Sequence, residues 1–181
     1  ENTLNISQEA FYGCKALQFT TYENGKYLGN NDNQHLMFFG TTDDELTSIS
    51  FHPNTKTINQ GAFDSHHGLS EVDIPDGIQS IGNSAFANCQ NLKSVAFGKK
   101  IKTIGSSAFE SCNSIVSIDI PNSVSCIGYA AFSNCSSLTS ISIPESIKRI
   151  ETWTFSNCSS LDTIILPDSI TFIGSEAFAI L

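Results

Sequence analysis

The sequence predicts an α/β solenoid, with a parallel sheet on its concave face and short strands and helical turns elsewhere. A stretch of 23 residues, Leu69 to Asn91, recurs along most of the chain. Apolar residues hold fixed places in each copy, and Gly and Pro recur at fixed offsets. A fixed period of roughly 20–50 residues is typical of solenoids, in which each repeat is one coil stacked on the next.

Six copies follow one another, counting the first apolar residue of each as position 1. They begin at Leu46, Leu69, Leu92, Ile115, Leu138 and Leu161. Residues 1–16 match the second half of the unit and form a partial repeat. We therefore expect one elongated domain over 1–181. Because it begins and ends within a unit, it is expected to be part of a longer protein.

Positions 4 and 6 predict the first strand of each coil. Ile141 and Ile143 are apolar, and Ser142 between them points outward, as in a strand with one buried face. Proline at position 7 lacks an N–H group and therefore ends the ladder. It occurs in four copies, at Pro75, Pro121, Pro144 and Pro167.

The second half of the unit predicts a short strand or bend, a corner and a helical turn. Positions 10 and 13 are apolar, as in Ile78 and Ile81, and position 14 is Gly in four copies. Glycine there is expected to provide unusual backbone angles. Cys89 follows Phe86 at the i, i+3 spacing of a helical turn.

The phenylalanines of position 18 are expected to stack into one internal spine that holds the coils together. Each buried side chain contributes roughly 1.5–3 kcal/mol, but only if a neighbouring coil covers it. The series is Phe11, Phe63, Phe86, Phe109, Phe132, Phe155 and Phe178.

Residues 17–45 interrupt the rhythm, and we interpret them as a β-meander that replaces part of a coil. Leu17 to Tyr22 is the first expected strand, and Asn24-Gly25 is a strong hairpin signal. Residues 26–28 form the return, and Leu36 to Phe39 a further strand. The segment is either a simple insertion or a loop that contacts a ligand.

Five of the six cysteines share position 21, namely Cys14, Cys89, Cys112, Cys135 and Cys158. This periodicity favours a column of small, reduced, buried side chains, with disulfides between adjacent coils as the alternative. The spacing matches no zinc-ligand pattern. Cys126 lies off the column and is the best candidate for a reactive thiol.

Charge and motif content exclude several classes of function. Nine Lys and Arg against eighteen Asp and Glu give a net charge of −9, which argues against nucleic-acid binding. No apolar run reaches the ~18–20 residues of a membrane span, so no membrane insertion is expected. Catalytic signatures and cofactor motifs are missing from the sequence, so we expect no enzyme, no cofactor and no metal site.

The pattern LxxIxIPxxIxxIGxxAFxxCxx resembles the BspA-like leucine-rich repeats of surface proteins from anaerobic and gut bacteria and from some parasitic protists. It is carried clearly by Ile141-Ser142-Ile143-Pro144, Ile127-Gly128, Ala131-Phe132 and Cys135. The resemblance implies a right-handed leucine-rich-repeat superhelix and a secreted or cell-surface location. It also implies adhesive binding to proteins, host matrix proteins among them, or to other cells. It implies no catalytic residue.

Outward positions of the predicted sheet are the best place for a ligand, because stacking turns positions 3 and 5 into two parallel rows. The candidate binding residues are Glu71, Asp73, Ser94, Ser117, Asp119, Ser140, Ser142 and Thr163. Their carboxylates favour a basic partner. The rows contain few aromatic residues and no Arg, which predicts weak or multivalent binding.

Three functions are compatible with these features. The favoured hypothesis is a protein-interaction or adhesion module. The second is a passive spacer in a cell-wall protein, which is favoured by the predominance of small Ser and Thr side chains in the outward rows. The third and remotest is a β-helix enzyme that acts on polysaccharide. Such an enzyme needs clustered acid and base groups, whereas Ala96 separates Asp73 from Asp119.

Overall fold

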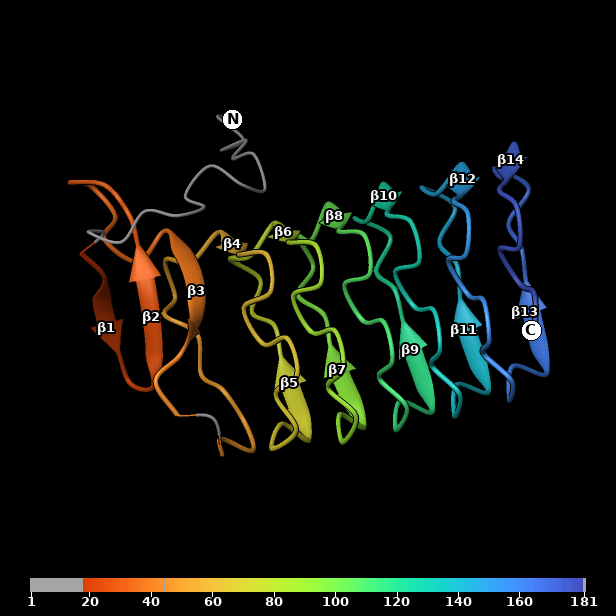
Figure 1. Cartoon of the computed structure of the whole chain (residues 1–181). Helices are drawn as coiled ribbons and strands as arrows, with labels where there is room; N and C mark the ends of the chain where they lie inside the picture. The colour runs from red at the N-terminus through yellow and green to blue at the C-terminus, as the bar shows by residue number, and fades with distance from the viewer. Residues whose placement is uncertain (1–17, 44, 181) are drawn as a thin grey trace.

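A computed structural model describes residues 18–43 and 45–180, so the partial repeat with Phe11 and Cys14 lies outside the described residues. The coils stand side by side in a single row, from the N-terminal meander to the C-terminus (Figure 1). The described part of the chain contains strands and no helix. The single-domain organisation and the repeat boundaries stay predictions.

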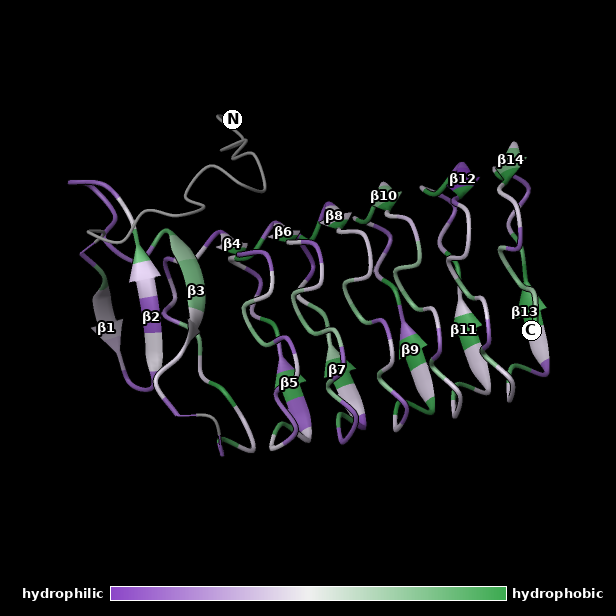
Figure 2. Cartoon of the chain, viewed as in Figure 1, coloured by the Kyte–Doolittle hydropathy of each residue, from purple (hydrophilic) through white to green (hydrophobic). Residues whose placement is uncertain are grey.

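Each full coil from Leu69 onward carries a three-residue and a two-residue strand. The three-residue strands are Glu71–Asp73 (β5), Ser94–Ala96 (β7), Ser117–Asp119 (β9), Ser140–Ser142 (β11) and Thr163–Ile165 (β13). The two-residue strands are Thr57–Ile58 (β4), Ser80–Ile81 (β6), Thr103–Ile104 (β8), Cys126–Ile127 (β10), Arg149–Ile150 (β12) and Phe172–Ile173 (β14). The middle residue of β5, β9 and β11 is buried between two exposed ones, and this apolar position recurs from coil to coil (Figure 2).

Residues 18–43 contain three antiparallel strands, Thr20–Tyr22 (β1), Gly25–Leu28 (β2) and Met37–Thr41 (β3). A two-residue turn joins β1 to β2, and its first residue, Glu23, has a φ of 48°. Strand β3 then pairs in parallel with β4, with Phe38 opposite Ile58. The meander therefore continues the row of two-residue strands at its N-terminal end.

The expected phenylalanine spine is confirmed from Phe63 to Phe178. Successive rings stack with centroids 4.9–5.6 Å apart and planes within 2–9° of parallel. Phe38 of the meander extends the stack, 4.9 Å from Phe63. The repeat pattern does not reveal Phe38, because this residue lies in the irregular segment.

The predicted helical turns, and with them the α/β class, are wrong: the fold is a β-solenoid. Positions 16 and 20 adopt left-handed backbone angles, with φ of 51° at Ser84 and 58° at Asn88, which no α-helix accommodates. The amide of Cys89 donates to Phe86 O, three residues back, but the amide of Phe86 donates to Ala108 O of the next coil. Alternate amides thus bind the neighbouring coil, and the i, i+3 spacing reflects a series of tight turns.

The glycines of position 14 let adjacent coils approach closely, and they do not adopt the unusual backbone angles that were expected. Among the described glycines, positive φ occurs at Gly40 and Gly61, neither of which is at position 14. A Cβ on Gly105 would lie 2.5 Å from Asn83 Oδ1 and 2.6 Å from Asn83 N, in the preceding coil. The missing side chain lets Gly105 N–H reach Ile81 O at 2.9 Å.

Two coils carry another residue at position 14, Asn59 and Glu151, and the strand pairing is interrupted at Glu151. Glu151 occupies position 14 of the coil that begins at Leu138. Gly128 and Gly174 donate their amides to Ile104 and Ile150 of the preceding coils, whereas Glu151 makes no such bond to Ile127. Strand β12 pairs with β14 and not with β10, so the seven-stranded sheet ends at β10. A Cβ alone does not account for this interruption, because the amide of Asn59 donates to Phe38 O at 2.8 Å although Asn59 also carries a side chain at position 14.

Candidate binding surface

The eight candidate binding residues all lie on the outward side of the three-residue strands, a surface that we call the β5–β13 face. Each of them is exposed. Parallel pairing places Glu71 beside Ser94, and Ser140 between Ser117 and Thr163. Side chains of one position therefore form rows across adjacent coils, and their role in binding stays a prediction.

The β5–β13 face consists of two separate sheets. Strands β5 and β7 form one, and β9, β11 and β13 form the other, with no pairing of β7 to β9. Asp73 lies opposite Ala96, whereas Asp119 lies opposite Ser142 in the other sheet. The two carboxylates therefore do not form a neighbouring pair of the kind that general acid–base catalysis uses.

A hollow of about 290 Å³ lies over β5 and β7. Its polar lining includes Glu71, Asp73 and Ser94, and Val95 is among its apolar residues. The hollow therefore combines two exposed carboxylates with an apolar wall, an arrangement that suits a basic side chain with an aliphatic stem. The sequence located the three polar residues but gave no sign of the hollow itself.

Two further hollows lie away from this face. One, of about 400 Å³, lies between the meander and the coil that begins at Leu46, where Lys26, Asp64 and His66 contribute to its lining. The other, of about 470 Å³, is lined mainly by hydroxyl and amide groups, including Ser111, Asn134 and Asn157. The sequence singled out neither, because each combines residues that lie far apart along the chain.

The described cysteines of position 21 are buried, form no disulfide with one another and are expected to react slowly. Each thiol donates a hydrogen bond to the phenylalanine carbonyl of the preceding coil, as Cys89 Sγ does to Phe63 O at 3.1 Å. Burial raises the pKa of Cys89 to about 12 and that of Cys158 to about 11. Since the thiolate is the nucleophile and the metal ligand, these side chains are poorly suited to either role. Cys126, in contrast, is exposed.

A cluster of histidine and tyrosine side chains joins the meander to the first full coil. The rings of His35 and His52 stack with centroids 3.9 Å apart, and Tyr22 meets His52 edge-on at 4.8 Å. The backbone amide of His52 donates to the Tyr27 hydroxyl, and Asn54 N–H donates to His52 Nδ1. Desolvation, followed by the neighbouring His35, lowers the pKa of His52. The sequence offered no signal for this cluster, whose members come from separate strands and turns.

No group of three or more His, Cys, Asp or Glu side chains that could hold a metal ion is found in 18–43 and 45–180. Within the same residues there is no helix long and apolar enough to cross a membrane. His66, at the cysteine position of its coil, has its Nε2 atom 3.1 Å from the carbonyl oxygen of Asp43.

Several bacterial leucine-rich-repeat proteins of known structure are similar to this chain. A leucine rich cell surface protein from Faecalibacterium prausnitzii is 30% identical with a TM-score of 0.80, over 92% of this chain and 47% of that one. A leucine-rich repeat protein from Bacteroides ovatus is 25% identical with a TM-score of 0.66, over 88% and 50%. The chain thus spans about half the length of these two proteins.

A third structure, the leucine-rich repeat protein of Treponema pallidum, shares the fold at 21% identity, with a TM-score of 0.67 over 87% of this chain and 86% of that one. No curated protein sequence matches the chain. The family model of the BspA type leucine rich repeat region, however, matches six copies over residues 1–75 and 56–180. This match spans nearly the whole sequence and agrees with the stacked coils, so the chain belongs to the BspA-type leucine-rich-repeat family.

Proposed function

We propose that this chain is a non-catalytic interaction module of a secreted or cell-surface bacterial protein, and that it binds a basic protein partner through the β5–β13 face. The observation that carries the proposal is the hollow over β5 and β7, where Glu71 and Asp73 flank an apolar wall. A Lys or Arg side chain fits this chemistry, since its stem packs on the wall while its charge meets the carboxylates.

Two further observations support the proposal. The family consists of repeat modules, and the F. prausnitzii relative is a cell surface protein, which favours the same location here. The net charge of −9 favours a basic partner over an acidic one. The predominance of small hydroxyl side chains along the rest of the face predicts modest affinity for a single module, with multivalency in a longer array.

The test is adhesion of the protein to a panel of immobilised matrix proteins and whole cells. Wild-type protein should bind at least one basic member of the panel, and Glu71→Gln with Asp73→Asn should weaken that binding about 3- to 10-fold. The matched control is Glu145→Gln with Asp168→Asn, which changes the net charge equally at exposed carboxylates in the turns after β11 and β13. Absence of wild-type binding across the panel would contradict the proposal.

A passive spacer is the second candidate. It is favoured by the rows of Ser117, Ser140 and Thr163, which lie in register and offer no aromatic anchor. A spacer tolerates replacement by an unrelated rod of equal length, whereas an interaction module does not. Exchange of the repeats for such a rod, followed by the same adhesion assay, therefore distinguishes the two.

A further inference from the structure

An exposed group of aromatic and charged side chains lies on the three C-terminal coils, away from the β5–β13 face. We call it the aromatic–arginine cluster; it consists of Tyr129, Arg149, Glu151, Trp153, Phe172 and Glu176. It contains the only Trp and the only Arg of the sequence. Tyr129, Trp153 and Phe172 are 41%, 40% and 38% exposed. Trp, Tyr and Arg are the residues most enriched at the energetic centres of protein interfaces.

The two large rings of the cluster are held in place by contacts within the chain. Tyr129 and Trp153 lie with ring centroids 5.1 Å apart and planes tilted by 53°. The indole Nε1–H of Trp153 donates to Glu176 Oε2, one coil further on, at 2.8 Å. An aromatic platform that is already ordered loses little side-chain entropy when a ligand binds.

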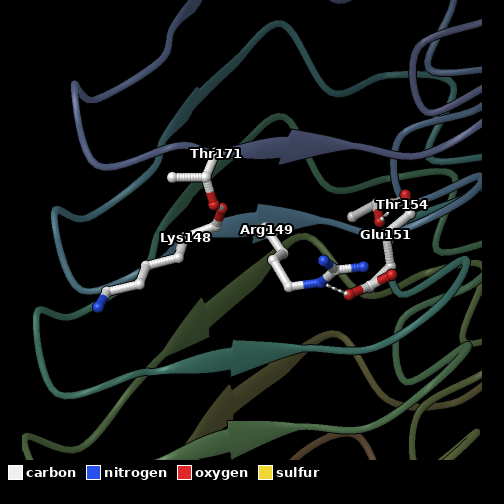
Figure 3. Close-up of polar contacts among 5 residues, drawn as sticks. All are labelled: Lys148, Arg149, Glu151, Thr154 and Thr171. Atoms are coloured by element: carbon white, nitrogen blue, oxygen red, sulfur yellow. Dashed lines mark hydrogen bonds and ion pairs between the residues drawn. The ribbon is translucent and has the colours of Figure 1, made fainter.

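The arginine is ordered as well. Arg149 Nε donates to Glu151 Oε1 at 2.8 Å, and its guanidinium lies 3.8 Å from the centroid of the Phe172 ring. Figure 3 shows Arg149 directed toward Glu151, whereas Lys148 extends the opposite way. Thr154 Oγ1 donates to the backbone carbonyl of Glu151 and steadies the same turn.

Two residues of the cluster depart from the residue types that most coils carry at their positions. Trp153 has a φ of 60° at position 16, where the four preceding coils carry small residues such as Ser107 and Ala130 and the last coil carries Glu176. Glu151 stands at the corner where four other coils carry glycine, and β10 does not pair with β12 there. Neither Trp153 nor Glu151 gains a buried position for its side chain. Local rules broken without a gain in packing are typical of functional sites.

The charges around the platform favour a cation. Glu151 neutralises Arg149, whereas the partner of the Glu176 carboxylate within residues 18–43 and 45–180 is the neutral indole N–H. One negative charge therefore remains beside the rings, on a chain whose net charge is −9. Ammonium and guanidinium groups bind the faces of Trp and Tyr, and a nearby carboxylate strengthens that contact.

We infer that the aromatic–arginine cluster is a second contact surface, which binds a Lys- or Arg-bearing segment of a partner protein on the Tyr129–Trp153 platform. This inference rests on the proposed function and extends it to a separate face of the same module.

The only Trp of the chain reports on this surface alone, so its fluorescence tests the inference directly. Titration with an eight-residue arginine peptide should change Trp153 emission saturably, and added salt should weaken the apparent affinity. Tyr129→Ser, and Glu151→Gln with Glu176→Gln, should each weaken it about 3- to 10-fold. Glu145→Gln with Asp168→Asn, at exposed carboxylates in the turns after β11 and β13 that belong to neither surface, changes the net charge equally and should leave the titration unaltered.

Several results would overturn the inference. An equal loss in both double variants would show general charge attraction. A saturable response to an eight-residue glutamate peptide or to a neutral oligosaccharide, with none to the arginine peptide, would assign the surface to another ligand. Matrix-protein adhesion that persists while the arginine peptide fails would reject this surface and leave the proposed function intact. An arginine response without any matrix-protein adhesion would support this surface and contradict the proposed function. Circular dichroism of each variant verifies its fold.

Discussion

The thiol of Cys112 donates a hydrogen bond to the backbone carbonyl of Phe86, one coil earlier, over 3.1 Å. That carbonyl also accepts the amide of Cys89 at 3.3 Å, within its own coil. Equivalent thiol bonds recur along the cysteine column, from Cys89, Cys135 and Cys158. The cysteines therefore tie consecutive coils together in addition to filling space.

Replacement of Cys112 by alanine removes one such tie. We expect Cys112→Ala to lower the free energy of unfolding by about 1–3 kcal/mol, through the lost hydrogen bond and a small void. Urea unfolding measures the difference. Cys126→Ala, at an exposed cysteine, is the matched control and should stay within about 0.5 kcal/mol of wild type. Equal effects of the two variants would mean that the column cysteines make no special contribution.

Thiol labelling should separate Cys126 from the column. In a Cys14→Ser background, a maleimide should modify Cys126 rapidly in the folded protein, and Cys126→Ser should abolish this reaction. Cys89, with its pKa raised to about 12, is roughly one part in ten thousand thiolate at pH 8 and is buried. Mass spectrometry before and after denaturation counts the labels. Rapid labelling of Cys89 in the folded state would contradict this prediction.

Insertion of a methyl group at a corner glycine should be costly. Gly105→Ala would place its Cβ 2.5 Å from Asn83 Oδ1 and 2.6 Å from Asn83 N. The coils must then move apart at this corner, and we expect a loss of about 1–3 kcal/mol in the free energy of unfolding. Ser117→Ala, at an exposed strand position, controls for the alanine and should have little effect. If Gly105→Ala leaves the free energy of unfolding unchanged, the corner accommodates the added methyl group without cost.

The repeat pattern was sufficient to predict the stacked coils, the phenylalanine spine and the outward rows that include Glu71 and Ser94, because each follows from one fixed period. It did not distinguish a helical turn from two tight turns. The i, i+3 spacing of Phe86 and Cys89 fits both, and the left-handed angles at Ser84 and Asn88 are not marked by glycine. Hollows and clusters that join several coils were likewise beyond a pattern that describes one coil at a time.

The stability of the meander should depend on pH through His52. Its pKa lies below the ordinary value, so the unfolded chain binds the proton more readily than the folded one. Neutral His52 therefore contributes fully to the free energy of unfolding above its ordinary pKa of about 6.5. This contribution is lost as the pH falls toward the lower pKa that His52 has in the folded protein. The titratable side chains in ring contact with His52 are His35, Tyr22 and Tyr27.

Urea unfolding at pH 7.5 and pH 5.0 measures this dependence. His52→Gln should reduce the loss of stability at the lower pH, because glutamine carries no titrating group. His67→Gln, at an exposed histidine, is the control and should retain the wild-type dependence. If His52→Gln leaves the pH dependence unchanged, the stacked histidine pair is not its source.

The interrupted corner at Glu151 makes a prediction about backbone dynamics. The amides of Gly128 and Gly174 bond to the preceding coils at 2.9 and 2.8 Å, whereas the amide of Glu151 has no such partner among the described residues. Hydrogen exchange at Glu151 should accordingly have a protection factor at least about tenfold lower than at the two glycines. Protection factors, not raw rates, are the proper comparison, because the intrinsic exchange rates of Glu and Gly differ.

Glu151→Gly should let β10 approach β12 and raise the protection of this amide. If the wild-type amide is already as protected as those of Gly128 and Gly174, the two coils are closed at this corner and the prediction is wrong.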